Sequence, residues 1–157
     1  MTPTAKLGLP ILALAISAAA SAGPLAYAGQ APHSEAFTLI ATKTGETLID
    51  SGQPTGIGNV FIGTSSFARG HDSDYGTGSA LCTNVSAEGA KLCSGTYELP
   101  DGQITWQRGQ PPVDAPPTGF DAAITGGTGK YSTARGYIHV IVPSREGPTE
   151  ETVYLQH

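Results

Sequence analysis

The chain has 157 residues, of which 39% are apolar and only 13% are charged, and its formal net charge at pH 7 is −5. This length suits one domain of ordinary size. Because lysine and arginine number 8 against 13 acidic residues and form no cluster, a nucleic-acid-binding or anionic-membrane-binding surface is excluded as a function class.

The N-terminus has the three parts of a secretory signal peptide. Lys6 supplies a positive charge, an alanine-rich apolar run follows from Leu7 to Ala22, and Ala26-Tyr27-Ala28 provides the small residues of a cleavage site. A transmembrane anchor is the alternative, but it would need about 20 strongly apolar residues without the proline and glycine found here. We therefore expect a signal peptide over residues 1–28 and one exported domain over residues 29–157, secreted or periplasmic, with no membrane association after cleavage.

The remaining sequence consists of short runs in which apolar and polar residues alternate, each bounded by Gly, Pro, Asp or Asn. No stretch has a sustained helical period, whereas alternation with a period of two is typical of strands. The expected strands are Glu35–Thr42, Val60–Phe67, Ala80–Ser86, Lys91–Leu99, Gln103–Arg108, Phe120–Thr125, Arg135–Val142 and Thr152–Gln156. This pattern predicts an antiparallel all-β fold, either a sandwich or a barrel.

Three connections between these strands are informative. Pro100-Asp101-Gly102 has the residue order of a tight turn, and the proline-rich segment Gln110–Thr118 indicates a surface loop. His71-Asp72-Ser73-Asp74 invites comparison with a calcium loop but lacks the closing glutamate, so a solvated acidic turn is favoured. We accordingly predict no metal site.

The chain has two cysteines, Cys82 and Cys93, on neighbouring predicted strands. If the two strands form a hairpin centred between Ala87 and Glu88, the cysteine side chains lie opposite each other on one face of the sheet, within cross-strand reach. In an exported protein a disulfide is favoured over two free thiols. A metal site is not supported here, because no histidine lies at ligand spacing.

A glycine-rich segment, Thr125–Lys130, suggests a phosphate-binding loop at first sight. The pattern G-x-x-x-x-G-K-[ST] would require glycine at Ile124 and serine or threonine at Tyr131, and a strand rather than a helix follows. The segment is therefore interpreted as a glycine-dependent turn between two strands. No G-x-S-x-G elbow and no partnered histidine points to a hydrolase.

The predicted strand Arg135–Val142 has two unlike faces. One face is aliphatic, and the other carries Arg135, Tyr137 and His139. In a closed barrel the polar face could line the lumen and fix a ligand, or it could face water. The sequence alone favours water slightly.

The glycine-rich segment lies in a longer run that resembles a known family. Phe120–Tyr131, followed by Ala134-Arg135-Gly136-Tyr137, is similar to the signature of dirigent proteins and of the related allene oxide cyclase barrels. Upstream, Ile49–Gly52 and the run from Cys93 to Thr105 are similar to exported bacterial members. The resemblance extends from about Phe37 to Leu155. It implies a closed, antiparallel, calycin-like small β-barrel of about eight strands, wide enough to hold one small ligand.

The resemblance also implies a kind of chemistry. Dirigent proteins hold phenoxy radicals and steer their coupling, and allene oxide cyclases close a reactive epoxide into one ring stereoisomer, so the protein mainly supplies shape and exclusion of water. No metal or organic cofactor is implied. Arg135 matches an arginine that is functional in dirigent proteins, and Asp50 stands where an acidic residue often begins the first long strand. Gly129 departs from plant members, which often have an acid there.

Two function classes follow for the lumen. The first is a template or cyclase for a small apolar, oxygenated molecule, in which Arg135 anchors an oxygen, Asp50 accepts a proton or hydrogen bond, and the phenol of Tyr137 or Tyr97 partners the arginine. The second is a non-catalytic ligand-binding or structural barrel, whose lumen would be filled by the aromatic side chains of Tyr97, Trp106 and Phe61. In either class the expected partner is a small apolar ligand, and the sequence leaves homo-oligomer formation open.

Overall fold

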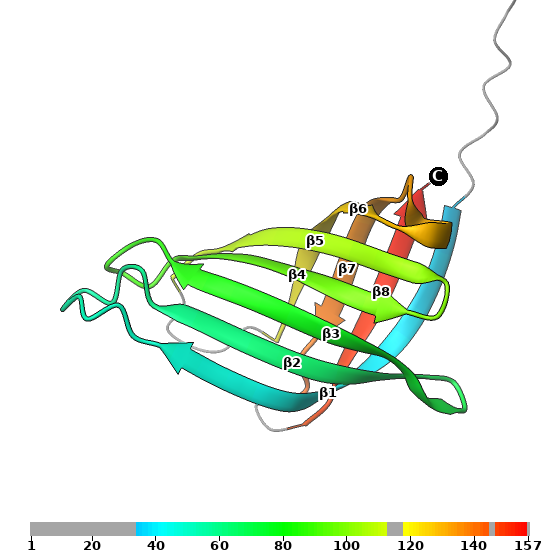
Figure 1. Ribbon diagram of the computed structural model, residues 1–157, viewed down its shortest axis with the longest axis horizontal. Helices are drawn as coiled ribbons and strands as arrows, with labels where there is room; N and C mark the ends of the chain where they lie inside the picture. Colours follow the sequence, from blue (N-terminus) through cyan, green and yellow to red (C-terminus); the bar gives the residue numbers. More distant parts are fainter. Residues whose placement is uncertain (1–33, 113–117, 145–146, 157) are drawn as a thin grey trace, which may run out of the picture. The chain divides into compact units, whose positions relative to one another are not determined.

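The computed structural model describes residues 34–112, 118–144 and 147–156. The predicted signal peptide lies outside these residues. The described residues form eight strands and one short 3₁₀ helix, namely β1 (Ser34–Ile49), β2 (Val60–Arg69), β3 (Asp72–Asn84), β4 (Lys91–Leu99), β5 (Gly102–Gln110), β6 (Gly119–Gly127), η1 (Gly129–Tyr131), β7 (Arg135–Ile141) and β8 (Thr149–Gln156). Each strand pairs antiparallel with the next, and β8 pairs with β1 (Figure 1). The predicted closed eight-stranded antiparallel barrel is thereby confirmed.

The predicted strand bounds differ from the observed ones mainly on β1 and β3. β4 has the predicted bounds, but β1 continues to Ile49 and β3 begins at Asp72. Asp72, Ser73 and Asp74, which were expected in an acidic turn, therefore belong to β3, and the turn consists of Gly70 and His71. Alternation fails as a signal in these stretches because glycine, serine and threonine occupy both faces. No helix among the described residues has the length and hydropathy needed to cross a membrane.

Alternation along each strand decides which side chains enter the barrel. On β1, Phe37, Leu39 and Ala41 are buried while Thr38 and Ile40 between them are exposed. Inward positions of one strand lie next to inward positions of the following strand, because residues paired across neighbouring strands face the same side.

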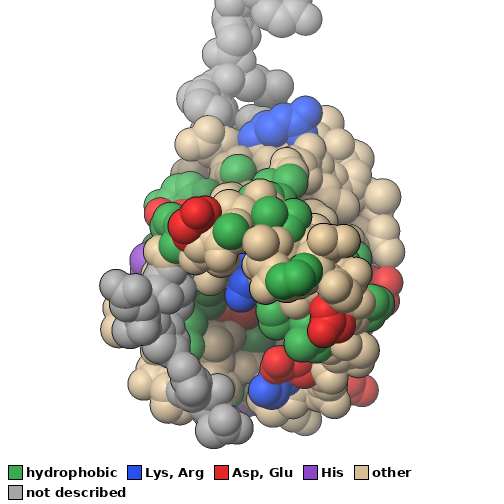
Figure 2. Space-filling model, turned by 90° about the vertical axis from the view of Figure 1, so that its left-hand side faces the viewer, with side chains coloured by type: hydrophobic (Ala, Val, Ile, Leu, Met, Phe, Trp, Pro, Cys, Tyr) green, Lys and Arg blue, Asp and Glu red, His purple; other side chains and the backbone are tan. Residues whose placement is uncertain are grey.

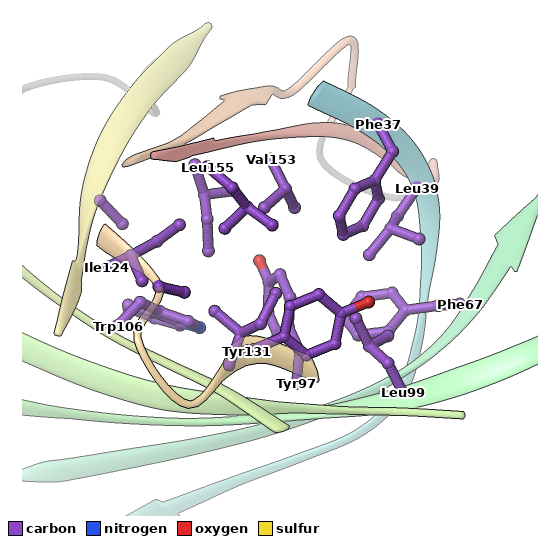
Figure 3. Packing of buried hydrophobic residues seen from close by; sticks show 14 of the residues in the cluster. Phe37, Leu39, Phe67, Tyr97, Leu99, Trp106, Ile124, Tyr131, Val153 and Leu155 are labelled. Carbon is purple, nitrogen blue, oxygen red and sulfur yellow. The ribbon is translucent and has the colours of Figure 1, made fainter. Parts of the chain in front are cut away.

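One half of the lumen is filled by a packed hydrophobic core, which we call the closed-end core. Its fully buried large side chains come from five strands and from η1 (Figure 3), and they are Leu39, Phe67, Ile104, Tyr131, Ile138, Val153 and Leu155. Tyr131 enters from the connection between β6 and β7, so this connection covers that end of the barrel.

The glycine-rich segment owes its composition to close contact with the β4–β5 turn. Gly129 has φ of 58°, and a Cβ there would overlap the carbonyl oxygen of Asp101. The amide of Lys130 donates to that same carbonyl at 2.8 Å. The predicted turn between two strands is thus confirmed, and it also holds Tyr131 in the closed-end core.

The cysteines form the predicted disulfide. Cys82 on β3 is paired with Cys93 on β4, with the Cα atoms 4.0 Å apart and a sequence separation of 11. Both residues face the lumen at the end opposite the closed-end core.

The disulfide should contribute measurably to stability. Closing so short a loop is worth about 2–3 kcal/mol in the chain-entropy model. We expect reduction to lower the free energy of unfolding by about this amount in urea denaturation, and the unreduced, unfolded protein to show no reactive thiol. Two titratable thiols per chain, or identical midpoints with and without reductant, would contradict the assignment.

A glycine on β4 makes room for the only tryptophan. A Cβ at Gly95 would overlap the ring of Trp106 and the carbonyl oxygen of Ser79, whereas a Cβ at Gly109 meets no atom within 4 Å. We predict that Gly95→Ala costs about 1–3 kcal/mol by overpacking and shifts the Trp106 fluorescence, and that Gly109→Ala does neither. Urea titrations followed by tryptophan emission test this, and equal effects of the two substitutions would contradict it.

Candidate functional site

The half of the lumen opposite the closed-end core is open and forms a cavity of about 350 Å³. Side chains from all eight strands line it, including the disulfide and three small residues on β2 and β3, Gly63, Gly78 and Ala80. Figure 2 shows this end, where the surface is hollowed. Such a volume suits one small organic molecule.

The most deeply buried polar contact of the cavity joins Glu151 on β8 to Tyr97 on β4. The Tyr97 hydroxyl donates a hydrogen bond to Oε2 of Glu151, and Thr149 donates to Oε1 at 2.9 Å. Glu151 is only 9% exposed and Tyr97 only 5%. We call Glu151 and Tyr97 the floor pair, because the ring of Tyr97 also packs edge-on against Phe67 of the closed-end core, with ring centroids 4.6 Å apart.

Burial sets the proton affinity of the floor pair. It raises the pKa of Glu151 above its ordinary value of 4.5, although the hydrogen bonds from Tyr97 and Thr149 oppose this rise. Burial, followed by the charge of the neighbouring Glu151 carboxylate, raises the pKa of Tyr97 well above 10. The carboxyl group of the pair therefore holds a proton below the raised pKa of Glu151 and is a carboxylate base above it.

The second polar group of the cavity is Arg108 on β5. Its guanidinium carbon lies 3.6 Å from the centroid of the Phe120 ring, and one terminal nitrogen donates to Gln110 at 2.9 Å. The Nε atom of Arg108 and the indole nitrogen of the neighbouring Trp106 are buried and have no hydrogen-bond partner. Burial lowers the pKa of Arg108.

The three residues predicted to be catalytic do not meet in this cavity. Arg135 is exposed, and its guanidinium donates to the carbonyl oxygen of Ala134 at 2.8 Å. Tyr137 is 43% exposed and stacks on Tyr154 outside the barrel, with ring centroids 4.7 Å apart. Asp50 follows β1 and accepts a hydrogen bond from the Gly52 amide at 2.9 Å.

The template hypothesis required Arg135 to point into the lumen, and the structure shows that it does not. Alternation along β7 allows only one face inside, and the aliphatic residues Ile138 and Val140 occupy it. The polar face meets water, as the sequence slightly favoured. Any catalytic role of Arg135, Asp50 or Tyr137 stays a prediction from resemblance.

The three aromatic residues predicted to bind ligand have different positions. Tyr97 and Trp106 are buried and line the cavity. Phe61 is half-buried and outside the cavity lining, with the Lys91 ammonium 4.3 Å from its ring centroid. The lumen is thus filled at one end only, and by the closed-end core rather than by Tyr97, Trp106 and Phe61 alone.

Sequence reasoning missed Glu151 and Arg108, yet both carried a usable signal. Glu151 is in phase with Val153 and Leu155, but the last strand was predicted to begin at Thr152, three residues after its observed start at Thr149. Arg108 is in phase with Trp106 and Ile104 on a strand that was predicted correctly in outline. In both strands, the usable signal was a charged residue two positions from a buried apolar residue, on the inward face.

Solved structures resemble this barrel, although no family model and no curated protein sequence matches the chain. Pyocyanin demethylase superposes with a TM-score of 0.64 at 22% identity, covering 76% of this chain and 99% of that one. The barrel has the dirigent and cyclase fold. A pterocarpan synthase dirigent protein has a TM-score of 0.59 at 20% identity over 88% of this chain and 96% of its own. A Diels-Alderase from Streptomyces koyangensis has a TM-score of 0.60 at 16% identity over 83% and 71%.

These comparisons confirm the fold that the resemblance implied. At such identities they show the shared barrel and nothing of this chain's substrate. The activities in their names, pyocyanin demethylase, pterocarpan synthase and Diels-Alderase, belong to those proteins.

The raised pKa of Glu151 predicts a pH dependence of stability. Between its ordinary pKa of 4.5 and its higher value in the folded barrel, the folded state binds more protons than the unfolded state. The contribution of Glu151 to the free energy of unfolding is therefore fully present below pH 4.5 and is lost as pH rises through the folded value.

Glu151→Gln should flatten the decline of stability with rising pH in that window, because the amide keeps an acceptor for Tyr97 but does not titrate. Urea denaturation of both proteins at a series of pH values measures this. Parallel pH profiles would show that Glu151 titrates normally.

Proposed function

We propose that the protein is exported, binds a small apolar, oxygenated molecule in the open half of its barrel, and templates the stereoselective cyclisation or coupling of that molecule. The observation that carries the proposal is the floor pair, a buried carboxyl group and phenol in the wall of a ligand-sized cavity. Buried ionisable groups with shifted pKa values are costly for stability and are concentrated at functional sites.

The lumen supports three contributions to such a reaction. Its walls restrict the conformations of the ligand and exclude water, which favours one ring closure or coupling geometry. Glu151 accepts a proton when it is deprotonated. The Tyr97 hydroxyl donates its one hydrogen to Glu151 and so fixes the orientation of that carboxyl group.

A non-catalytic binding barrel is the second candidate function. The closed-end core favours it, because a rigid, half-filled barrel stores a ligand as readily as it transforms one. The two candidates share the binding step and differ in whether Glu151 moves a proton.

Two glycines provide a matched test of binding. Gly63 faces the cavity and Gly109 faces outward, and a Cβ at either position meets no atom within 4 Å. We expect Gly63→Leu to fill the cavity and lower the affinity for the neutral fluorophore N-phenyl-1-naphthylamine by at least about tenfold, and Gly109→Leu to leave it unchanged. Fluorescence titration measures both, and equal affinities would show that the probe does not use the lumen.

Proton transfer by Glu151 can be tested with 5-nitrobenzisoxazole. A base removes the proton on its C3 atom, the released electron pair forms the nitrile as the N–O bond breaks, and 2-cyano-4-nitrophenolate absorbs visible light. Above the raised pKa of Glu151, we expect the wild-type barrel to be faster than Glu151→Gln by on the order of 100-fold. Equal rates in two proteins that both bind the neutral fluorophore would favour the binding barrel.

A further inference from the structure

The open half of the lumen holds a cation that the floor pair does not neutralise. Arg108 faces inward on β5, next in phase after Trp106, and is paired across to Cys93, which places it beside the disulfide. It is half-buried and its pKa is lowered by burial alone, with no contribution from Glu151.

The neighbours of Arg108 leave its charge unmatched. One terminal nitrogen donates to the neutral amide of Gln110, one face of the guanidinium lies against Phe120, and Nε is buried without a partner. The ion pairs of residues 34–112, 118–144 and 147–156 are Lys43 with Glu46, Lys130 with Glu35, and His139 with Asp121, and none includes Arg108. Buried donors in native proteins are nearly always satisfied, so an unmatched guanidinium in a cavity wall indicates a missing acceptor.

The surroundings also specify the rest of the ligand. The indole nitrogen of Trp106, a second unpartnered donor, lines the same cavity and points toward the middle of the barrel in Figure 3. Phe120, Ala122, Val140 and Val142 supply apolar wall on the β6–β7 side. A planar guanidinium with parallel N–H groups matches the two oxygens of an acid group better than a single hydroxyl or carbonyl oxygen.

We propose that Arg108 selects a small organic anion as the ligand of the lumen, with its acid group on the guanidinium and its apolar body against Trp106 and Phe120. This inference rests on the proposed function, because it names the class of molecule that the same cavity takes. The acid group at Arg108 then orients the ligand so that its far end reaches Glu151 and Tyr97. Arg108 is in this view a specificity-determining residue, and the proton transfer remains with the floor pair.

The experiment compares two fluorophores that share one aromatic body. 1-Anilinonaphthalene-8-sulfonate carries an acid group, and N-phenyl-1-naphthylamine is its neutral counterpart. For the wild-type full-length chain, we expect the anion to bind more tightly than the neutral probe by at least about tenfold, which is the scale of a charge-assisted hydrogen bond. Arg108→Met should abolish this preference while keeping the affinity for the neutral probe, and Arg108→Lys should retain part of it.

Lys130→Met is the matched control, because it removes one positive charge from the outer surface, where the ammonium pairs with Glu35, and should leave both affinities unchanged. Gly63→Leu should weaken both probes, which shows that they occupy the lumen. Circular dichroism and urea denaturation establish that each variant is folded.

The outcomes separate this inference from the function on which it rests. If the wild type binds the neutral probe in the lumen as well as or better than the anion, the role of Arg108 is overturned and the binding barrel stands. If Lys130→Met removes the preference as fully as Arg108→Met does, the preference arises from overall charge and the inference fails. If neither probe binds the folded wild type in a manner sensitive to Gly63→Leu, the proposed function fails as well.

Discussion

Closure of the sheet constrains everything else in this molecule. When β8 pairs with β1, no strand edge remains, and every residue of every strand must point either into a narrow lumen or out to solvent. A shift of one residue in any strand would exchange the two sets. The cavity wall is therefore fixed by register, and the contacts between inward side chains follow from the strand pairing.

Within that constraint, the division of the lumen follows from where large and small residues stand. The closed-end core is built from large side chains with η1 over them, so it has no room for a ligand. Toward the disulfide, the inward positions of β2 and β3 carry small residues, which leave this part of the lumen open. They are Gly63, Ser65, Gly78 and Ala80. A Cβ at Gly78 would overlap the ring of Phe67 and a Cβ at Gly95 the ring of Trp106, so these glycines let both rings pack closely against β3 and β4. The packed core and the cavity thus lie at opposite ends of one barrel.

Local alternation predicted the strands, and the placement of two cysteines predicted the disulfide. The choice of a closed barrel over a sandwich came from the family resemblance. The sequence could not place Arg135, because a strand with one polar and one aliphatic face can present either face to the lumen. Only the closed barrel shows which face is inside. Asp50 was placed by resemblance alone, and a residue just beyond a strand end takes its position from a loop that the pattern does not fix. Glu151 and Arg108 could have been predicted, since each occupies a strand position in phase with buried residues. Glu151 was missed because the last strand was predicted to begin at Thr152.

Glu151 and Arg108 differ in how well the protein satisfies their hydrogen-bonding groups, and this difference bears on the roles proposed for them. The carboxyl group of Glu151 accepts hydrogen bonds from Tyr97 and Thr149, so the folded barrel holds it in one orientation without any ligand. Arg108 has a neutral amide, an aromatic face and one unmatched N–H, so its best partner is not part of the described chain. A group satisfied by the protein is positioned for chemistry, whereas a group left unsatisfied is positioned for recognition. With both in one cavity, a ligand held at Arg108 would extend its body along the apolar wall toward a carboxyl group that the barrel has already oriented.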